Sequence, residues 1–275
     1  MKRDFRRPQV MAIVNVTPDS FYAGSRKEDS ASLHARIEQV VREGASMVDV
    51  GGYSSRPGAA EVPLEEEWRR VERGISAVRE VAPEMTVSVD TFRADVAQRA
   101  VEKFGEVIVN DISAGELDAA MIPAVADMGV PYIAMHMKGT PQTMQQQTDY
   151  DCGIVTSVTE YFRDKTAQLL TAGIRRENLI LDPGFGFAKT LEQNYELLAG
   201  LNRLVGEGFP VLAGLSRKSM IYKYLGSTPE AALAGTIALD WECLMKGATI
   251  LRVHDVREAV DSVRLFELYK KQQKA

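Results

Sequence analysis

Short apolar runs alternate with amphipathic runs eight times along the 275 residues, and this alternation limits the fold more than any other feature of the chain. The apolar runs are strand-like and cover residues 10–14, 47–50, 86–89, 107–109, 132–135, 179–181, 211–212 and 250–253. Eight strand–helix repeats within about 260 residues predict a (β/α)8 barrel, an α/β fold. Because no long linker or composition break separates the repeats, we expect residues 1–275 to form a single domain.

The amphipathic runs have helical spacing, as shown by one face that carries Leu64, Trp68, Val71, Ile75 and Val78. A doubly wound open sheet also alternates strands with helices and is therefore the alternative fold. Two features favour the barrel. No GxGxxG motif follows the first strand, and polar residues follow nearly every strand rather than a single switch point.

The composition limits the classes of partner. A net charge of -5 argues against a nucleic-acid partner, because binding to a phosphate backbone needs a clustered basic surface. Cys152 and Cys243 lie far apart with no histidine near them, so we expect neither a zinc site nor a disulfide. No signal peptide is evident, and no apolar run approaches the ~20 residues of a membrane helix. We therefore expect a soluble, cytoplasmic protein with no membrane partner.

The expected strands end in polar residues that form a divided set. Acceptors follow the middle strands, and donors and cations follow the last two. The set comprises Asn15, Asp90, Asn110, Asp111, His136, Asp182, Ser216, Arg217, Lys218, Ser219, Arg252 and His254. Because a parallel barrel brings the carboxyl ends of its strands to one rim, where such folds keep their active sites, we expect these side chains to face one mouth.

The acceptors and the cations indicate two parts of one ligand. A flat heterocycle with N–H groups would pair with Asp90, Asn110 and Asp182. Phe187, or the methylene stem of Lys218, could cover the face of that heterocycle.

Arg252 and Lys218, with His254 and the donors of residues 54–56, would suit a phosphate or diphosphate. Arg217 is a further cation in the same stretch as Lys218. The sequence therefore predicts a heterocycle carrying phosphate, held across the barrel mouth.

Several of these residues have a purely structural alternative. Asp90 and Asp111 could cap the helices that follow them. Asp182, before Pro-Gly, could form a turn, and the glycines of GFGF could serve backbone geometry alone. We expect His136 to be structural, and Arg252 and His254 could make surface pairs with the last helix. Segments 17–30, 51–63 and 137–151 are longer than the usual βα loop and are candidate lids.

Eight ordered sequence blocks, one after each expected strand, make the chain resemble the dihydropteroate synthase family over nearly its whole length. The blocks are IVNVTPDSF (13–21), GASMVDVGGYSSRPGA (44–59), SVDTF (88–92), VNDIS (109–113), MHMKGTPQTMQ (135–145), DPGFGFAKT (182–190), GLSRKS (214–219) and RVHDV (252–256).

The resemblance implies the condensation of 6-hydroxymethyl-7,8-dihydropterin diphosphate with p-aminobenzoate in folate biosynthesis, by a dissociative substitution in a sulfonamide-sensitive site. It implies Mg2+ as cofactor and a homodimer. The pterin residues that it implies are Asp90, Asn110, Met137, Asp182, Phe187 and Lys218. The implied diphosphate residues are Asn15, Ser55, Arg56, Arg252 and His254, and Asn15 is also the implied metal ligand. The implied p-aminobenzoate residues are Phe21, Pro57 and Ser219. Asp90, Asp182, Lys218, Arg252 and His254 are the implied catalytic residues.

Two positions depart from the family pattern. Ala23 stands where the first lid usually carries an aspartate, and Tyr53 stands near the position of the usual glutamate of the second lid. These losses leave two alternatives open. One is a pterin-binding methyltransferase on the same barrel, against which the diphosphate cations argue. The other is a non-catalytic pterin-binding paralogue, which release of diphosphate would exclude.

Overall fold

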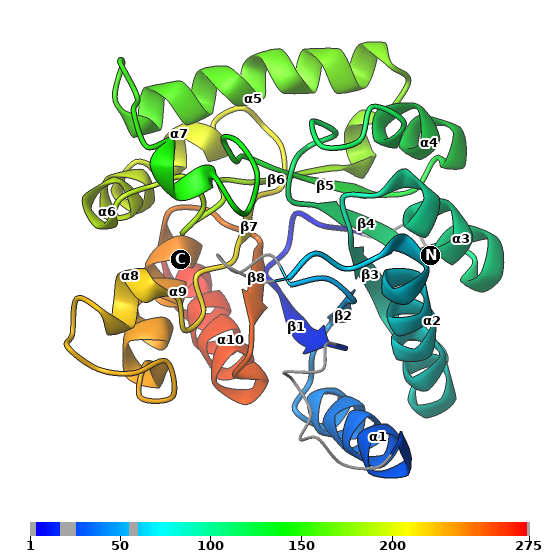
Figure 1. Ribbon diagram of the computed structural model, residues 1–275. Coiled ribbons are helices and arrows are strands. Elements are labelled where there is room, and N and C mark those ends of the chain that lie inside the picture. Colours follow the sequence, from blue (N-terminus) through cyan, green and yellow to red (C-terminus); the bar gives the residue numbers. More distant parts are fainter. Residues whose placement is uncertain (1–3, 17–25, 55–59, 274–275) are drawn as a thin grey trace.

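The computed structural model describes residues 4–16, 26–54 and 60–273, which form eight parallel strands surrounded by helices (Figure 1). The strands are β1 (Gln9–Asn15), β2 (Met47–Gly51), β3 (Thr86–Asp90), β4 (Ile108–Asp111), β5 (Tyr132–Met135), β6 (Leu179–Asp182), β7 (Leu212–Ala213) and β8 (Ile250–Val253). All eight predicted strands are present, with small differences at their ends. Several extend further toward the mouth than predicted, because their polar last residues still pair with the neighbouring strand.

The sheet closes into a barrel. Its strand order is β6-β5-β4-β3-β2-β1-β8-β7, and every neighbouring pair is parallel. A parallel bridge between Leu181 and Val211 joins β6 to the start of β7, and the amide of Leu181 donates to the carbonyl of Pro210 at 2.9 Å. The predicted (β/α)8 barrel is therefore confirmed, and the open sheet is excluded.

The helices alternate with the strands and pack outside them. They are α1 (Arg26–Arg42), α2 (Leu64–Val81), α3 (Ala94–Phe104), α4 (Met121–Met128), α5 (Ile154–Thr171), α6 (Leu191–Ala199), α7 (Leu201–Val205), α8 (Ser219–Tyr222), α9 (Leu233–Met245) and α10 (Val256–Gln272), with short 3-10 helices η2 (Met144–Gln146) and η3 (Arg176–Asn178). In α2 the predicted apolar face is the buried one, through Val71, Ile75 and Val78. Because α1 begins at Arg26, the first candidate lid ends earlier than predicted; its residues 17–25 lie outside the described part of the chain.

An apolar layer fills the barrel beneath the polar rim. We call this layer the barrel floor; it consists of Phe5, Met11, Met47, Ile108, Ile133, Ile180, Leu212 and Ile250. Alternate residues of a strand point to the same side of the sheet. The residues two positions after four of the floor residues are polar, and they are Asp49, Asn110, Asp182 and Arg252. The strand period therefore sets a polar layer directly above the apolar one.

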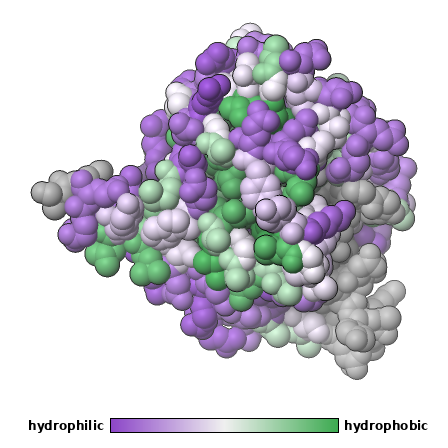
Figure 2. Space-filling view, turned by 90° about the vertical axis from the view of Figure 1, so that its left-hand side faces the viewer, coloured by the Kyte–Doolittle hydropathy of each residue, from purple (hydrophilic) through white to green (hydrophobic). Residues whose placement is uncertain are grey.

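One side of the molecule exposes apolar side chains. Figure 2, which looks at the side that carries α6 and α8, shows hydrophobic residues gathered among hydrophilic ones. The large hydrophobic side chains exposed among the described residues are Leu170, Tyr224, Leu225, Met245, Leu265, Leu268 and Tyr269. Within residues 4–16, 26–54 and 60–273, no helix combines the length and apolar character that crossing a membrane requires.

Candidate active site at the barrel mouth

An arginine bound between two carboxylates lies at the centre of the polar layer. Arg252 of β8 donates from Nε to Asp49 Oδ2 at 2.6 Å and from Nη2 to Asp90 Oδ2 at 2.7 Å. Asn110 of β4 donates from its amide nitrogen to the same oxygen of Asp49 at 3.1 Å. We call Asp49, Asp90 and Arg252 the strand cluster. Asp49 uses one N–H of Asn110, so the amide oxygen and the second N–H of Asn110 are left for a ligand.

Asp49 is the residue of this cluster that the sequence analysis missed. It is buried in the middle of β2, and its Oδ1 has no hydrogen-bond partner within the described residues. A signal was available, because a charged residue in the apolar run MVDV must lie on the same face as Met47. The barrel interior can hold this carboxylate because Arg252 compensates its charge.

Burial and the neighbouring charges oppose each other in the strand cluster. Burial raises the pKa of Asp90 to about 7; Arg252 opposes that change and Asp49 adds to it. Burial alone would lower the pKa of Arg252, but the carboxylates of Asp49 and Asp90 outweigh it and raise that pKa. Arg252 therefore remains a cation, and one of its terminal nitrogens is left for a ligand.

A second group of charges consists of Asp182 at the end of β6 and Lys218 after β7, and both contact the loop between β6 and α6. Asp182 is buried and accepts from the amide of Gly184 at 2.8 Å through Oδ1. Burial raises the pKa of Asp182, and Lys218 opposes that change. The ammonium of Lys218 donates to the carbonyl of Phe185 and lies 4.6 Å from the ring centre of Phe187. Burial lowers the pKa of Lys218 to about 8, with Asp182 opposing.

Apolar side chains cover the same part of the mouth. Ile112, Met135, Met137, Met144 and Ala188 form a buried cluster, against which Phe92, Leu117 and Phe187 pack. The cluster brings together Met137 and Phe187, the two apolar residues that the resemblance implies for the pterin. Gly186 allows the stem of Lys218 to approach, since a Cβ there would lie 3.2 Å from Lys218 Cδ. The mouth thus offers apolar contacts beside polar acceptors.

His254 lies beside the strand cluster but carries no charge near neutral pH. Its Nδ1 lies 3.1 Å from the hydroxyl of Ser216, and its carbonyl accepts from Arg36 at 2.7 Å. Burial, reinforced by Arg252, lowers the pKa of His254 to about 4. A neutral imidazole can donate a hydrogen bond to an anion but cannot neutralise its charge.

Arg217 does not serve the mouth, contrary to the sequence-based expectation. Its guanidinium makes a bidentate pair with Asp255, at 2.8 and 2.7 Å. The remaining Nη1 donates to the carbonyls of Pro229 and Glu230, both at 2.9 Å. These bonds hold the segment before α9 to the start of α10, so of the two cations in GLSRKS only Lys218 remains for a ligand.

Asp111 and His136 have structural surroundings. The carboxylate of Asp111 accepts from the amide of Ser113 at 2.8 Å and from the hydroxyl of Tyr132 at 2.7 Å. His136 is buried, and its ring packs edge-on against Tyr161 at 4.8 Å between centroids. Neither side chain contributes an open group to the mouth.

Only some of the remaining residues predicted for the site belong to the described part of the chain. Phe21, Ala23, Ser55, Arg56 and Pro57 lie outside the described residues. Of the others, Ser219 is the first residue of α8 and Asn15 is the last residue of β1.

Asn15 and Asp90 both lie beside Gly51. A Cβ built on Gly51 would lie 3.6 Å from Asn15 Oδ1 and 3.5 Å from Asp90 Oδ2, so the two oxygens flank a residue without a side chain. On the second lid, Tyr53 packs its ring edge-on against Phe92 at 5.1 Å.

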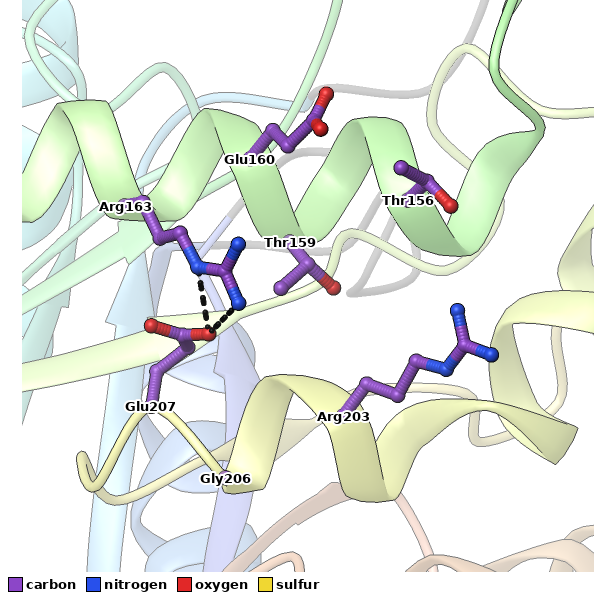
Figure 3. A pocket seen from close by; sticks show the side chains of 7 residues that line it. All are labelled: Thr156, Thr159, Glu160, Arg163, Arg203, Gly206 and Glu207. Atoms are coloured by element: carbon purple, nitrogen blue, oxygen red, sulfur yellow. Dashed lines mark hydrogen bonds and ion pairs between the residues drawn. The ribbon is translucent and has the colours of Figure 1, made fainter.

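A polar groove of about 340 Å³ lies elsewhere, between α5 and the end of α7 (Figure 3). It is lined by Thr156, Thr159, Glu160, Arg163, Arg203, Gly206 and Glu207. Arg163 and Glu207 form an ion pair across it at 2.9 Å. None of the residues predicted for ligand binding belongs to this groove, so the barrel mouth is the candidate active site.

Fold and site together define a class of protein: a (β/α)8 barrel enzyme that binds a flat heterocycle at the carboxyl ends of its strands. The family model of pterin binding enzymes matches residues 11–254.

Among the relatives and solved structures that this chain resembles are dihydropteroate synthases. The dihydropteroate synthase of Escherichia coli (strain K12) is 42% identical over 264 residues, which are 96% of this chain and 92% of that protein. The Xanthomonas albilineans dihydropteroate synthase with 4-aminobenzoic acid superposes with a TM-score of 0.88 at 40% identity, covering 97% of this chain and 94% of that one. The Yersinia pestis dihydropteroate synthase in complex with a sulfonamide drug superposes with a TM-score of 0.88 at 38% identity. The match covers 98% of this chain and 96% of that one.

The chain therefore belongs to the dihydropteroate synthase family. This confirms the predicted resemblance and the assignment to the transferases of folate biosynthesis.

Proposed function

We propose that the barrel mouth binds 6-hydroxymethyl-7,8-dihydropterin diphosphate through the residues described above and joins it to p-aminobenzoate. The observation that carries these residue roles is the convergence of acceptors in one polar layer. Asp90, Asp182 and the amide oxygen of Asn110 come from three strands and share the mouth. A pterin edge, with its ring N–H and amino groups, is the complementary donor set.

The faces of the pterin would contact the apolar cluster. Met137 and Phe187 belong to that cluster, and Lys218 lies over the Phe187 ring. The ammonium of Lys218 would donate to an acceptor atom of the pterin, next to the carboxylate of Asp182. Acceptors on one side and an ammonium on the other match the alternating donors and acceptors of a pterin.

The diphosphate would lie on the side of Arg252 and His254. Arg252 brings a fixed positive charge, and the neutral ring of His254 brings a hydrogen bond. We assign Asn15, Ser55 and Arg56 to the same group on the family pattern. Phe21, Pro57 and Ser219 are assigned in the same way to p-aminobenzoate.

Asn15 is the residue we assign to Mg2+. Magnesium takes oxygen ligands and commonly keeps few from the protein, the rest being water and substrate phosphate. The amide oxygen of Asn15 fits this chemistry, and it lies beside Gly51, on the same rim as Asp90. In the described part of the chain no group of three or more His, Cys, Asp or Glu side chains could hold a metal, so water and substrate phosphates would supply the other ligands. When bound, the ion would supply charge neutralisation to the leaving group.

The proposed reaction is a dissociative substitution at the methylene carbon. The bond from this carbon to the diphosphate oxygen breaks, and its electron pair leaves with the diphosphate. The positive charge that develops is delocalised into the dihydropterin ring, where Asp90 and Asp182 stabilise it. The amine of p-aminobenzoate then donates its electron pair to the carbon and loses a proton. No nucleophilic side chain is required.

The test is diphosphate release by the purified protein, given the pterin diphosphate and Mg2+, with and without p-aminobenzoate. Release that requires p-aminobenzoate, yields dihydropteroate and is competed by a sulfonamide is the expected result. Binding of the pterin without any release would overturn the proposed catalysis and would make Ala23 and Tyr53 the first positions to change.

We also propose that the active form is a cytoplasmic homodimer. Leu265, Leu268 and Tyr269 are exposed on α10, which packs against α9, where Met245 is also exposed. A second copy of the chain would cover this apolar surface. The expected result is a dimer mass by light scattering that the double substitution Leu265→Glu with Leu268→Glu reduces to a monomer. Leu170→Glu, on α5, is the matched control, and a monomeric parent protein would contradict the assignment.

A further inference from the structure

The loop between β6 and α6 is folded around a buried lysine that the proposed function does not use. Lys189 is only 4% exposed. Its Nζ donates to the carbonyl of Gly184 at 2.9 Å, to the carbonyl of Phe187 at 2.8 Å and to Nδ1 of His136 at 3.1 Å. An ammonium has three donors, and all three are used. Lys189 therefore has no N–H left for a ligand, and its influence must pass through these three partners.

One of those partners, Gly184, is hydrogen-bonded to the carboxylate of Asp182, which we assign to the pterin. Gly184 accepts from Lys189 through its carbonyl and donates through its amide to Asp182 Oδ1 at 2.8 Å. The backbone of His136 supports the same turn, because its amide donates to the carbonyl of Asp182 at 3.0 Å. A side chain at position 184 would place its Cβ 2.1 Å from the carbonyl oxygen of His136, so this packing requires glycine. The ammonium, the turn and the carboxylate form one connected chain of contacts.

The turn is also conformationally costly. Gly184, Gly186 and Ala188 all have positive φ, at 69°, 80° and 50°. For Ala188 this left-handed conformation costs on the order of 1 kcal/mol or more and needs support from its surroundings. The hydroxyl of Tyr150 binds the carbonyl of Ala188 at 2.9 Å, and Lys189 binds the carbonyl just before it, that of Phe187. Without these bonds the turn would relax, and the ring of Phe187 would move with it.

We propose that Lys189 is a positioning residue: by binding the carbonyls of Gly184 and Phe187 it fixes the carboxylate of Asp182 and the Phe187 ring in the geometry that the pterin requires. This role rests on the proposed binding of a pterin at the mouth. Lys189 itself touches no ligand.

The charges that face Lys189 support a role beyond packing. Asp182 at the end of β6, His136 after β5 and Lys218 after β7 surround it. Burial lowers the pKa of Lys189 to about 7, while Asp182 opposes that change and Lys218 adds to it. Burial lowers the pKa of His136 well below its usual value, with Lys189 and Lys138 acting in the same direction, so its imidazole is neutral and accepts through Nδ1. Loss of the Lys189 proton would remove one donor and the positive charge beside Asp182.

The test compares Lys189→Met with the matched control Lys165→Met. Lys165, on α5, is also a buried lysine, but its ammonium pairs with Glu116 of the loop between β4 and α4 at 3.0 Å. The probe is 6-hydroxymethylpterin, whose dissociation constant is measured by fluorescence, together with KM for both substrates and thermal stability. We expect Lys189→Met to weaken pterin binding about tenfold or more and to leave KM for p-aminobenzoate nearly unchanged, because a displaced carboxylate affects only the pterin. Lys165→Met is expected to lose stability without losing pterin affinity.

A pH series adds a readout that packing alone would not change. Asp90 ionises in the same pH range in the parent protein and in Lys189→Met, so the readout is the ratio of their pterin affinities. The advantage of the parent protein over Lys189→Met is expected to shrink as the pH rises through about 7 and Lys189 loses its proton. Lys189→Gln, which keeps two donors without the charge, should lie between the parent and Lys189→Met.

Three results would overturn the inference. Unchanged pterin affinity in Lys189→Met would do so, and so would an equal loss of affinity in Lys165→Met. Failure of both Lys189 variants to fold would assign the residue to folding rather than to positioning. A parent protein that binds no pterin would instead overturn the proposed function on which the inference rests.

Discussion

The two halves of the mouth hold their charges in different ways. In the strand cluster, Arg252 pairs with Asp49 and Asp90 through side chains that all project from strands. In the loop half, Asp182 faces Lys189 and Lys218, and both ammonium groups bind backbone carbonyls of one tight turn. The first half is positioned by the pleat of the barrel. In the second half only Asp182 projects from a strand, and the two ammonium groups are held by the conformation of a loop.

This difference has an electrostatic consequence. Arginine remains protonated at every pH at which proteins fold, so the cation of the strand cluster is fixed. The lysines of the loop half have pKa values of about 7 and about 8, because both are buried. Arg252, which we assign to the diphosphate, therefore has a permanent positive charge. Lys218, which we assign to the pterin, has a charge that can respond to a ligand.

The largest expected effect comes from removing the fixed cation. Arg252→Met would leave Asp49 and Asp90 without their cation inside the barrel. Removing one partner of a buried ion pair costs about 3–5 kcal/mol, so we expect a large loss of stability together with loss of diphosphate release. Urea denaturation and the release assay measure the two effects. Arg252→Lys keeps one charge and should be intermediate; a stable but inactive Arg252→Met would show that the cluster serves the ligand alone.

In the loop half, by contrast, substitution of Asp182 should reduce activity far more than stability. Asp182→Asn removes the charge but keeps an oxygen that can accept from the amide of Gly184. We expect kcat/KM for the pterin diphosphate to fall about 100-fold, since the developing positive charge loses a carboxylate. The melting temperature should change by only about 3 °C or less. Equal losses of activity and stability would count against the assigned role.

The same contrast explains how much of the site the sequence could predict. Strand ends and the period of two are visible in the sequence, so Asp90, Asn110, Asp182 and Arg252 were expected at the mouth, and the barrel brings them there. Asp49 was missed because only the strand ends were considered, although the strand period places it above Met47.

The loop half could be predicted less well for a physical reason. Lys189 binds carbonyl oxygens, which every residue has and which therefore leave no mark in the sequence. Arg217 was wrongly expected to face the ligand, since its partner Asp255 is 38 residues away along the chain and Arg217 itself has a φ of 55°. Which way a side chain leaves such a turn depends on tertiary contacts that local patterns do not contain.

A smaller effect is expected on the pH dependence of kcat/KM, in which the two halves of the mouth should act on different limbs. The carboxylate of Asp49 contributes to the raised pKa of Asp90, so Asp49→Asn should lower that pKa. If catalysis needs an ionised Asp90, the acid limb of kcat/KM moves to lower pH. The alkaline limb, to which the lysines of the loop half contribute, should stay in place. A pH–rate profile of parent and variant provides the measurement, and movement of both limbs together would show that the halves are electrostatically coupled.

The smallest expected effect concerns a buried carboxyl that belongs to neither half. Asp240 of α9 is 2% exposed, and its Oδ1 has no hydrogen-bond partner within the described residues. Burial raises its pKa well above the usual value, and Asp255 adds to this. An acid with a raised pKa in the folded state stabilises the fold below its unfolded pKa of about 3.9, and this contribution is lost as the pH rises through the folded pKa. Unlike Asp49 and Asp90, it pairs with no cation in the described part of the chain that could offset that loss.

Asp240→Asn should therefore gain stability relative to the parent protein as the pH is raised from 5 to 8, with catalytic activity nearly unchanged, because α9 lies outside the barrel. Urea denaturation of both proteins at a series of pH values measures the difference. A constant difference across the series would show that Asp240 ionises as readily in the folded as in the unfolded protein, and that burial without a cation is less costly here than the structure indicates. The charges at the mouth would then need no pairing to be tolerated, and the large effect expected for Arg252→Met would have to be revised downward.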